Sequence, residues 1–307
     1  MTNNKFVYFP PGRKEYFFSV NLMEKSRGVD FLYSPFSVST KLFWNLLLNS
    51  NFFRSFFTCD QKSMPSSIQT ILKLLDSNNA AFQIKIGTEG PDQKTTLIKY
   101  SKKDITFFKI GNTKRGIELI NNEYAILNEL NGKFNAPKVK NFYLKEGVQF
   151  METDYIIAQK IKSTTINESI FLYLLNIASR NVDSNESITT SFNHGDCCPW
   201  NLLQQGESNV LLIDWELAGK YVLGYDLFTY VFQTAFLLTP NISNRQILED
   251  NMVWIQRFFD NFDIEDIKQY LSCFVIAKLE DEKRKGKVSK LTKKYLQLHQ
   301  DLPNLQL

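Results

Sequence analysis

The pattern of apolar residues changes twice along the chain, and this restricts the fold more than any other feature. Three short runs rich in β-branched and aromatic residues are separated by turn-forming segments: 81–86, 95–100 and 105–110. Such runs predict an antiparallel meander. Apolar residues at helical spacing follow in 116–132, and strand-like runs lie near 138–143 and 147–152. Strands, one helix and further strands predict a compact α+β unit.

From about residue 155 the chain is predicted to be mostly helical. The helix-type runs are 168–181, 226–238, 245–260 and 263–279. A β-hairpin interrupts them, with strands at 201–204 and 210–214 on either side of a QGESN turn. A β-rich part is therefore expected to precede a larger helical part.

The first 80 residues form an aromatic-rich N-terminal extension. Within it, 41–57 is strongly apolar with few charges, and we expect it to be helical. This helix either packs on the β-rich part or provides peripheral association with a membrane surface. The expected division of the chain is an extension at 1–80, a β-rich lobe at 81–153 and a helical lobe at 154–307.

Composition excludes several classes of protein. A hydrophobic share of 43% predicts a packed globule, and a net charge of +4 does not suggest a nucleic-acid binder. Two of the four cysteines, Cys197 and Cys198, are adjacent, which fits neither a zinc ribbon nor a disulfide framework. Neither a signal peptide nor a window of about 18 uninterrupted apolar residues is found. We therefore expect a reduced, cytoplasmic protein.

The chemistry is concentrated in NHGDCCPWNLL (193–203) and LLIDWE (211–216). The hairpin between them should bring Asn201 and Asp214 together at its open end. Asp196 lies five residues before Asn201, on the loop that enters the hairpin. Two of these three side chains suit a hard cation such as Mg²⁺, and the remaining aspartate can face a substrate hydroxyl. This is the minimal equipment for phosphoryl transfer.

The pattern H-G-D-x-x-x-x-N followed by I-D-W-E resembles the aminoglycoside phosphotransferase and choline kinase superfamily, the small-molecule relatives of protein kinases. The resemblance covers roughly residues 80–280 and implies a two-lobed, protein-kinase-like fold. It implies that Asp196 is the catalytic base, that Asn201 and Asp214 hold Mg²⁺, and that His194 braces the loop.

The same resemblance assigns roles in the β-rich lobe. It implies that Lys109, at the end of the third predicted strand, binds the nucleotide phosphates and that Glu123 in the next helix orients it. Lys85 and Lys99 are also strand lysines, but neither directly precedes that helix.

The loop GTEGPDQK is expected to cover the phosphates through backbone N–H groups at Gly87 and Gly90, although it lacks a full G-x-G-x-x-G. The hinge that binds the nucleotide base is expected at Glu152, Thr153 and Asp154.

Two further positions have competing interpretations. Asp226 resembles a structural aspartate of the superfamily, but its position predicts a helix N-cap, which we favour. Glu216 is either a carboxylate beside the metal or an exposed acid at a strand end. Cys197 and Cys198 occupy variable positions of the loop, and we expect no role for them.

The predicted activity is transfer of the γ-phosphate of ATP or GTP, with Mg²⁺, to a hydroxyl of a small molecule. The acceptor stays open between a sugar, a glycan precursor and an amino alcohol. Acidic residues of the helical lobe could line a site for a cationic acceptor: Glu249, Asp250, Asp260, Asp263, Glu265 and Asp266.

Three other classes compete with this interpretation. A catalytically silent nucleotide-binding scaffold is the main alternative, and the complete set of Lys, Glu, Asp, Asn and Asp argues against it. A protein kinase fits less well, because H-R-D, D-F-G and A-P-E are absent. A metal hydrolase built on His194 and Asp196 would need further histidines nearby, and the chain has two in all.

Overall fold

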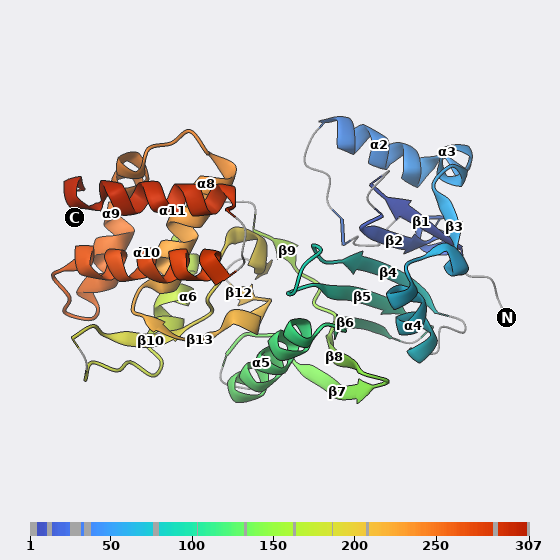
Figure 1. The fold of residues 1–307 in the computed structure, drawn as a ribbon, viewed down its shortest axis with the longest axis horizontal. Helices are drawn as coiled ribbons and strands as arrows, with labels where there is room; N and C mark the ends of the chain where they lie inside the picture. Colours follow the sequence, from blue (N-terminus) through green and yellow to red (C-terminus); the bar gives the residue numbers. More distant parts are fainter. Residues whose placement is uncertain are drawn as a thin grey trace. The chain divides into compact units, whose positions relative to one another are not determined.

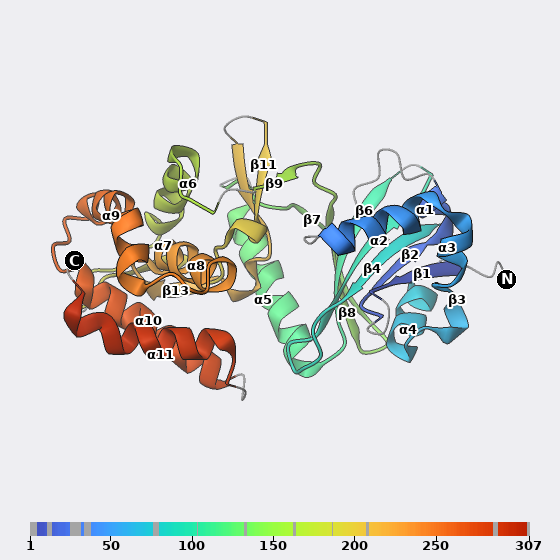
Figure 2. The same cartoon turned by 90° about the horizontal axis from the view of Figure 1, so that it is seen from above.

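The computed structural model of the chain has two compact units (Figures 1 and 2). The N-terminal unit comprises Met1–Asn128 and Pro137–Ile156, and the C-terminal unit comprises Glu129–Ala136 and Ile157–Leu307. The structure describes residues 5–10, 14–24, 32–33, 38–75, 80–102, 104–131, 134–161, 164–185, 187–206, 209–284 and 288–305.

The N-terminal unit is built on an eight-stranded antiparallel sheet with the order β3-β1-β2-β4-β5-β6-β8-β7. The predicted meander is confirmed as β4 (Ala81–Ile86), β5 (Lys94–Tyr100) and β6 (Ile105–Gly111). The predicted helix is α5 (Lys114–Leu130), and the last two strands are β7 (Val139–Lys145) and β8 (Val148–Asp154). Stacking of Tyr124 on Phe142, with ring centroids 3.8 Å apart, packs α5 against β7.

Residues before position 80 extend the same sheet, which the sequence analysis did not predict. The added strands are β1 (Lys5–Phe9), β2 (Tyr16–Ser19) and β3 (Thr58–Asp60). β2 joins the meander by pairing antiparallel with β4, where Phe17 lies opposite Ile84. The helices of this region are α1 (Val20–Glu24), α2 (Val38–Asn49), α3 (Asn51–Ser55) and α4 (Ser66–Leu74), with a short 3₁₀ turn η1 (Gln61–Ser63).

Alternating side chains of β1 and β2 build two apolar layers. Phe6 and Phe17 pack with α4 on one face, whereas Val7 and Phe18 pack with Trp44 of α2 on the other. Because successive side chains of a strand point to opposite faces, both faces of this part of the sheet can be covered by helices.

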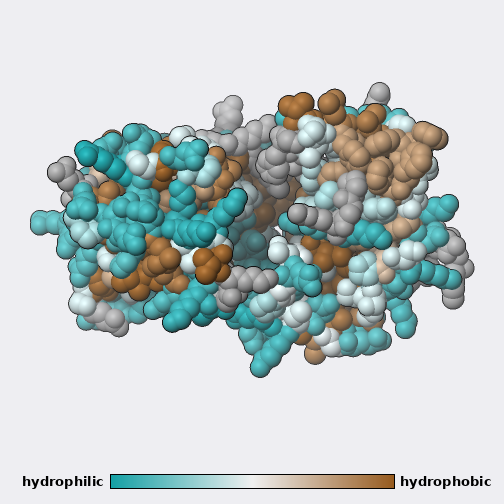
Figure 3. All heavy atoms as spheres, turned by 45° about the horizontal axis from the view of Figure 1, so that its top comes forward, coloured by the Kyte–Doolittle hydropathy of each residue, from teal (hydrophilic) through white to brown (hydrophobic). Residues whose placement is uncertain are grey.

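The predicted helix at 41–57 is two helices, because Ser50 interrupts it and caps α3 by accepting a hydrogen bond from the Phe53 N–H at 3.1 Å. One face of the pair packs on the sheet through Trp44 and Leu47. The other face leaves Phe52 at 76% and Phe56 at 63% exposed, and apolar side chains gather at this part of the surface (Figure 3). The predicted packing is thus confirmed for one face, and association with a membrane stays a prediction.

The C-terminal unit is mostly helical, as predicted. Its helices are α6 (Glu168–Ala178), α7 (Tyr225–Phe228), α8 (Thr234–Leu238), α9 (Asn244–Asp260), α10 (Ile267–Arg284), α11 (Lys290–Asp301) and the 3₁₀ turn η5 (Leu302–Asn304). The run predicted as one helix at 226–238 contains a π-helical segment, η4 (Thr229–Gln233), between α7 and α8. In the described part of the chain, every helix is too short or too polar to cross a membrane.

The predicted hairpin is present as β11 (Leu202–Gln205) and β12 (Asn209–Leu212), and β9 (Gln159–Lys160) pairs with β11. A second small sheet pairs β10 (Thr190–Asn193) with β13 (Gly219–Val222). These two sheets hold both ends of the 193–201 loop. An aromatic core that includes Phe228, Phe274 and Tyr295 lies among the helices.

Candidate active site

The loop at 193–201 begins where β10 ends and closes in a 3₁₀ turn, η2 (Pro199–Asn201), before β11. Gly195 adopts φ +89°, a conformation that favours glycine. A Cβ atom at this position would lie 2.5 Å from the carbonyl oxygen of Leu217. The H-G-D motif therefore requires glycine on both conformational and steric grounds.

Asp226 anchors this loop, and the N-cap role we favoured for it is wrong. The N-cap of α7 is Gly224, at φ +82°. The buried carboxylate of Asp226 instead accepts the N–H of Gly195 at 2.9 Å and the N–H of His194 at 2.5 Å. Burial raises the pKa of Asp226 to about 6, although these two hydrogen bonds act to lower it. Its charge is thus retained by pairing with the backbone of the loop.

His194 holds the loop against the hairpin. Its Nδ1 accepts the N–H of Asp196 at 3.3 Å, so the proton lies on Nε2, which donates to the carbonyl oxygen of Ile213 at 3.1 Å. The ring is fully buried and lies edge-on to Trp215, with centroids 4.8 Å apart. This arrangement agrees with the bracing role implied by the sequence.

Asp196 and Asn201 are brought together as the spacing predicted. The Asn201 amide nitrogen donates to the backbone oxygen of Asp196 at 2.9 Å and to its Oδ2 at 3.1 Å. Because the NH₂ group is used in these bonds, the amide oxygen of Asn201 is the atom suited to a cation. Burial raises the pKa of Asp196, while the nearby Lys278 charge and the hydrogen bonds from Gln233 and Asn201 act to lower it.

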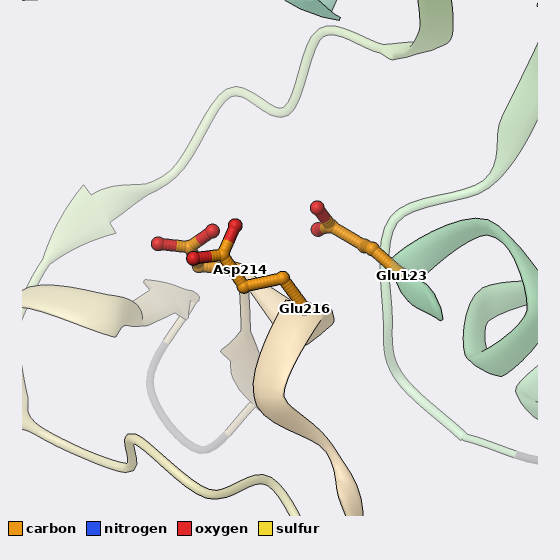
Figure 4. Close-up of side chains that lie close together, drawn as sticks. All are labelled: Glu123, Asp214 and Glu216. Atoms are coloured by element: carbon orange, nitrogen blue, oxygen red, sulfur yellow. The ribbon is translucent and has the colours of Figure 1, made fainter. Parts of the chain in front are cut away.

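Asp214 lies between β12 and the 3₁₀ turn η3 (Trp215–Leu217) in a left-handed conformation, with φ 74° and ψ 52°. Such a backbone is strained for a residue other than glycine and concentrates at functional sites. Asp214 and Glu216 place carboxylate oxygens within 4.8 Å of each other, and Figure 4 shows the two groups side by side. Glu216 is half-buried rather than exposed, which favours its interpretation as a second carboxylate beside a metal.

The N-terminal unit brings Lys109 of β6 and Glu123 of α5 together. Lys109 Nζ lies 2.7 Å from both carboxylate oxygens of Glu123. The Lys109 side chain is 13% exposed and the Glu123 side chain 2%. Burying an ion pair costs hydration energy that the attraction between the charges barely repays, so the pair adds little to stability. Its presence here therefore indicates a functional role.

Gly87 does not fit the phosphate-binding role predicted for its N–H group. That N–H donates to the carbonyl oxygen of Lys94 at 2.7 Å and closes the β4–β5 hairpin. A Cβ at Gly87 would also meet the same oxygen at 2.6 Å, so this glycine is explained by the hairpin itself. Gly90 lies further along the loop, and its contact with phosphates stays a prediction.

The predicted hinge residues lie inside the sheet. Glu152 and Thr153 of β8 pair with β6 on one side and with β7 on the other, and Asp154 pairs with Thr106 of β6. Their backbone groups are used by the sheet, so a base-binding backbone is better placed in 155–158, which follows β8 without regular structure.

Comparisons with known proteins bear on the resemblance to small-molecule phosphotransferases. A profile described as the phosphotransferase enzyme family matches residues 164–251, which include the 193–201 loop and Asp214. The predicted resemblance is confirmed. A search of curated proteins found no significant match. The profile supports assignment of the chain as a phosphotransferase.

Two structures of one enzyme support the kinase-like fold. The structure of aminoglycoside phosphotransferase APH(4)-Ia is similar with a TM-score of 0.51 and 10% identity, covering 78% of this chain and 98% of that protein. A thermostable mutant of the same enzyme, in a ternary complex with ADP and hygromycin B, gives a TM-score of 0.50 at 8% identity over 76% and 97%. Choline kinase LicA from Streptococcus pneumoniae gives 0.48 at 12% identity over 78% and 100%.

Sequence reasoning missed three groups that surround Asp196. Gln233 of η4 donates to its Oδ1 at 2.7 Å, Cys198 places its sulfur 3.9 Å from the same oxygen, and Lys278 of α10 is buried nearby. Gln233 and Lys278 are 37 and 82 positions from Asp196, so no local spacing could have indicated them.

Proposed function

We propose that the protein transfers the γ-phosphate of ATP or GTP, in the presence of Mg²⁺, to a hydroxyl of a small molecule. The arrangement of Asp196, Asn201 and Asp214 carries this proposal. A half-buried carboxylate hydrogen-bonded to a loop asparagine, followed by a strained aspartate at a strand end, provides one base and two oxygen ligands. The profile match over the same residues supports this assignment.

In the proposed reaction, the amide oxygen of Asn201 and the carboxylate of Asp214 would hold Mg²⁺. When bound, the ion would neutralise charge on the phosphates. Asp196 accepts a hydrogen bond from the acceptor hydroxyl, orients it for in-line attack on the γ-phosphate, and takes its proton as the bond between the γ- and β-phosphates breaks and ADP or GDP leaves. His194 and Asp226 keep the loop in place through the hydrogen bonds of His194 to Ile213 and of Asp226 to the loop backbone.

Lys109 is proposed to bind nucleotide phosphates. Its ammonium is held by both oxygens of Glu123, which limits its freedom and lowers the entropic cost of binding a phosphate group. The related fold of APH(4)-Ia in complex with ADP supports a nucleotide donor. Cytoplasmic localisation and a preference between ATP and GTP stay predictions.

The acceptor is proposed to bind near Asp196, and the acidic residues considered from the sequence do not favour a cationic one. Three of them lie exposed on α9 and are engaged on the surface of that helix: Glu249 with Arg245, Asp250 with Gln246, and Asp260 with Gln256. Exposed pairs of this kind are typical of a solvated helix. A sugar or glycan hydroxyl therefore fits the described surroundings at least as well as an amino alcohol.

Replacing Asp214 with alanine tests the nucleotide site directly. We expect Mg²⁺ plus ATP or GTP to raise the unfolding temperature of the wild-type protein and the Asp214→Ala variant to lose this shift, because a metal ligand is removed. Asp250→Ala, at an exposed position of α9, is the matched control and should keep the shift. A Mg²⁺-dependent shift of equal size in Asp214→Ala would contradict the proposed metal site.

Replacing Lys109 with methionine is expected to weaken binding of Mg²⁺–ATP by about 10- to 100-fold, because a charge-assisted contact to phosphate is lost. Calorimetric titration measures the change. Lys85→Met is the matched control, since Lys85 is also a strand lysine of the sheet but lies on β4. Equal affinity in both variants would exclude Lys109 from the phosphate site. Binding without turnover in the wild type, for every hydroxyl acceptor tried, would instead favour the silent scaffold.

A further inference from the structure

Gln233 makes two hydrogen bonds to the 193–201 loop, the catalytic loop of the proposed mechanism, through one amide nitrogen. Its Nε2 donates to Asp196 Oδ1 at 2.7 Å and to Cys198 Sγ at 3.3 Å. Since Asn201 donates to the other carboxylate oxygen, both oxygens of Asp196 are held by side-chain amides. The carboxylate is thereby fixed in one orientation, with its remaining lone pairs available for an acceptor hydroxyl.

The orientation of the Gln233 amide is set by the groups on its other side. Its Oε1 lies 3.2 Å from the hydroxyl of Tyr295 and 3.4 Å from Nζ of Lys278. An ammonium group has donors only, so the opposite amide orientation would place NH₂ against NH₃⁺. Lys278 on one side and the Asp196 carboxylate on the other therefore both favour the orientation in which Gln233 presents its donor to Asp196.

Lys278 is an unusual residue to find in this position. It is 6% exposed, and its Nζ lies 4.6 Å from the ring centroid of Tyr225 and 3.4 Å from the carbonyl oxygen of Gly195. Burial lowers the pKa of Lys278, whereas the charges of Asp196, Asp281 and Asp226 act to raise it. A buried lysine costs stability unless its charge is used, and packing alone would be served by an apolar side chain.

Gln233 is also the last residue of the π-helical segment η4. A π-helical turn contains one more residue than an α-helical turn, so it changes the direction of the side chains at its end. Such segments are rare and are frequently found at functional sites. The segment is thus a local departure from the α-helix that ends at the residue in contact with Asp196.

We propose that Gln233 and Lys278 are positioning residues, in which the buried ammonium orients the Gln233 amide and the amide holds the Asp196 carboxylate for attack by the acceptor hydroxyl. This inference rests on the proposed phosphotransferase function. Neither residue contacts the substrate in this proposal, and Lys278 acts through Gln233. Removing Lys278 should then add nothing once Gln233 is gone.

The test is a double-mutant cycle on the slow hydrolysis of Mg²⁺–ATP, in which water is the acceptor. The rate that depends on Asp196 is the difference between the wild-type protein and Asp196→Asn. We expect Gln233→Leu and Lys278→Met each to lower this rate about 10- to 100-fold at unchanged KM for ATP, and the double variant to be no slower than Gln233→Leu. Lys283→Met, an exposed lysine of the same helix, is the control and should keep the wild-type rate.

Gln233→Glu keeps the size of the side chain and its acceptors towards Lys278, but it cannot donate to Asp196. It should be as slow as Gln233→Leu. Agreement between the two variants would show that the loss does not come from disturbed packing around leucine. If Gln233→Leu kept the wild-type rate, or if the losses added in the double variant, the proposed action of Lys278 through Gln233 would be overturned. If the wild-type protein hydrolysed Mg²⁺–ATP no faster than Asp196→Asn, the proposed function would be overturned, and the positioning roles of Gln233 and Lys278 with it.

A second measurement does not depend on turnover. The side-chain amide signals of Gln233 in a ¹⁵N spectrum of the protein without nucleotide are those that disappear in Gln233→Leu. We expect them to shift in Lys278→Met and in Asp196→Asn, and to stay in place in Lys283→Met. Unchanged signals in Lys278→Met would show that Lys278 does not orient this amide.

Discussion

Replacing Asp196 with asparagine is expected to lower phosphoryl transfer about 1,000-fold, because removal of a positioned general base typically costs 10²–10⁴-fold in rate. The substitution keeps the size of the side chain. It also removes one of the two acceptors that face Gln233 and Asn201, so the asparagine can satisfy only one of these donors. Binding of Mg²⁺–ATP should be nearly unchanged, since Asn201 and Asp214 are retained.

Steady-state turnover and calorimetric binding of Mg²⁺–ATP measure the two effects separately. Asp183→Asn is the matched control: Asp183 also lies in the C-terminal unit, and its carboxylate pairs with the exposed Lys220 at 2.7 Å. Full activity in Asp196→Asn would remove the base from the mechanism. Equal loss of binding and turnover would mean that Asp196 holds the metal rather than the acceptor.

The catalytic loop could be predicted from the sequence because its chemistry fixes residue types at short spacing. Asp196, Asn201 and Asp214 lie within 19 positions, and a tight hairpin leaves few ways to arrange them. The meander at 81–110 was equally accessible, since each strand pairs with its neighbour in sequence. Local order of this kind needs no knowledge of the rest of the fold.

Contacts between distant segments account for what was missed. β2 joins the sheet through β4, more than 60 positions later, and its YFFS run lacks the polar–apolar alternation that marks a half-exposed strand. Asp226 looked like a helix cap because its immediate surroundings are those of a helix start. Its partners are the amides of His194 and Gly195, 32 and 31 positions earlier.

The same reasoning explains the errors in the N-terminal unit. Gly87 was predicted to bind phosphate because glycine-rich loops do so, but its N–H closes a hairpin. Glu152 and Thr153 were predicted as the hinge because they end a strand, yet β8 is paired on both sides at these positions. In both cases hydrogen bonding inside the sheet already uses the backbone groups that were predicted to bind the nucleotide.

Buried charge is the common feature of the groups assigned here to function. Asp226 and Lys278 are buried in the C-terminal unit, where Asp196 is half-buried, and Glu123 is buried in the N-terminal unit beside the mostly buried Lys109. Each ionised group is held by an opposite charge, by backbone amides or by a side-chain amide, as burial of charge requires. Because apolar residues would stabilise these interiors at least as well, the charges are better explained by phosphoryl transfer than by folding.

Replacing Gly195 with alanine is expected to be the most damaging single methyl addition to the catalytic loop. The positive φ costs an alanine roughly 1–2 kcal/mol, and the new Cβ would lie 2.5 Å from a backbone oxygen, that of Leu217. Backbone cannot move aside as a flexible side chain can, so the loop itself must shift. We expect a loss of at least about 3 kcal/mol in the free energy of unfolding, together with a loss of turnover.

Gly206→Ala is the control that separates the two costs. Gly206 also has a positive φ, +75°, but a Cβ there would meet no atom within 4 Å. Urea unfolding should therefore show about 1 kcal/mol of destabilisation for Gly206→Ala, with turnover retained, and a clearly larger loss for Gly195→Ala. Equal unfolding midpoints for the two variants would mean that the loop can relax away from Leu217. In that case the close packing of Gly195 would not be what holds Asp196 in place, and Asp226 would be left as its principal anchor.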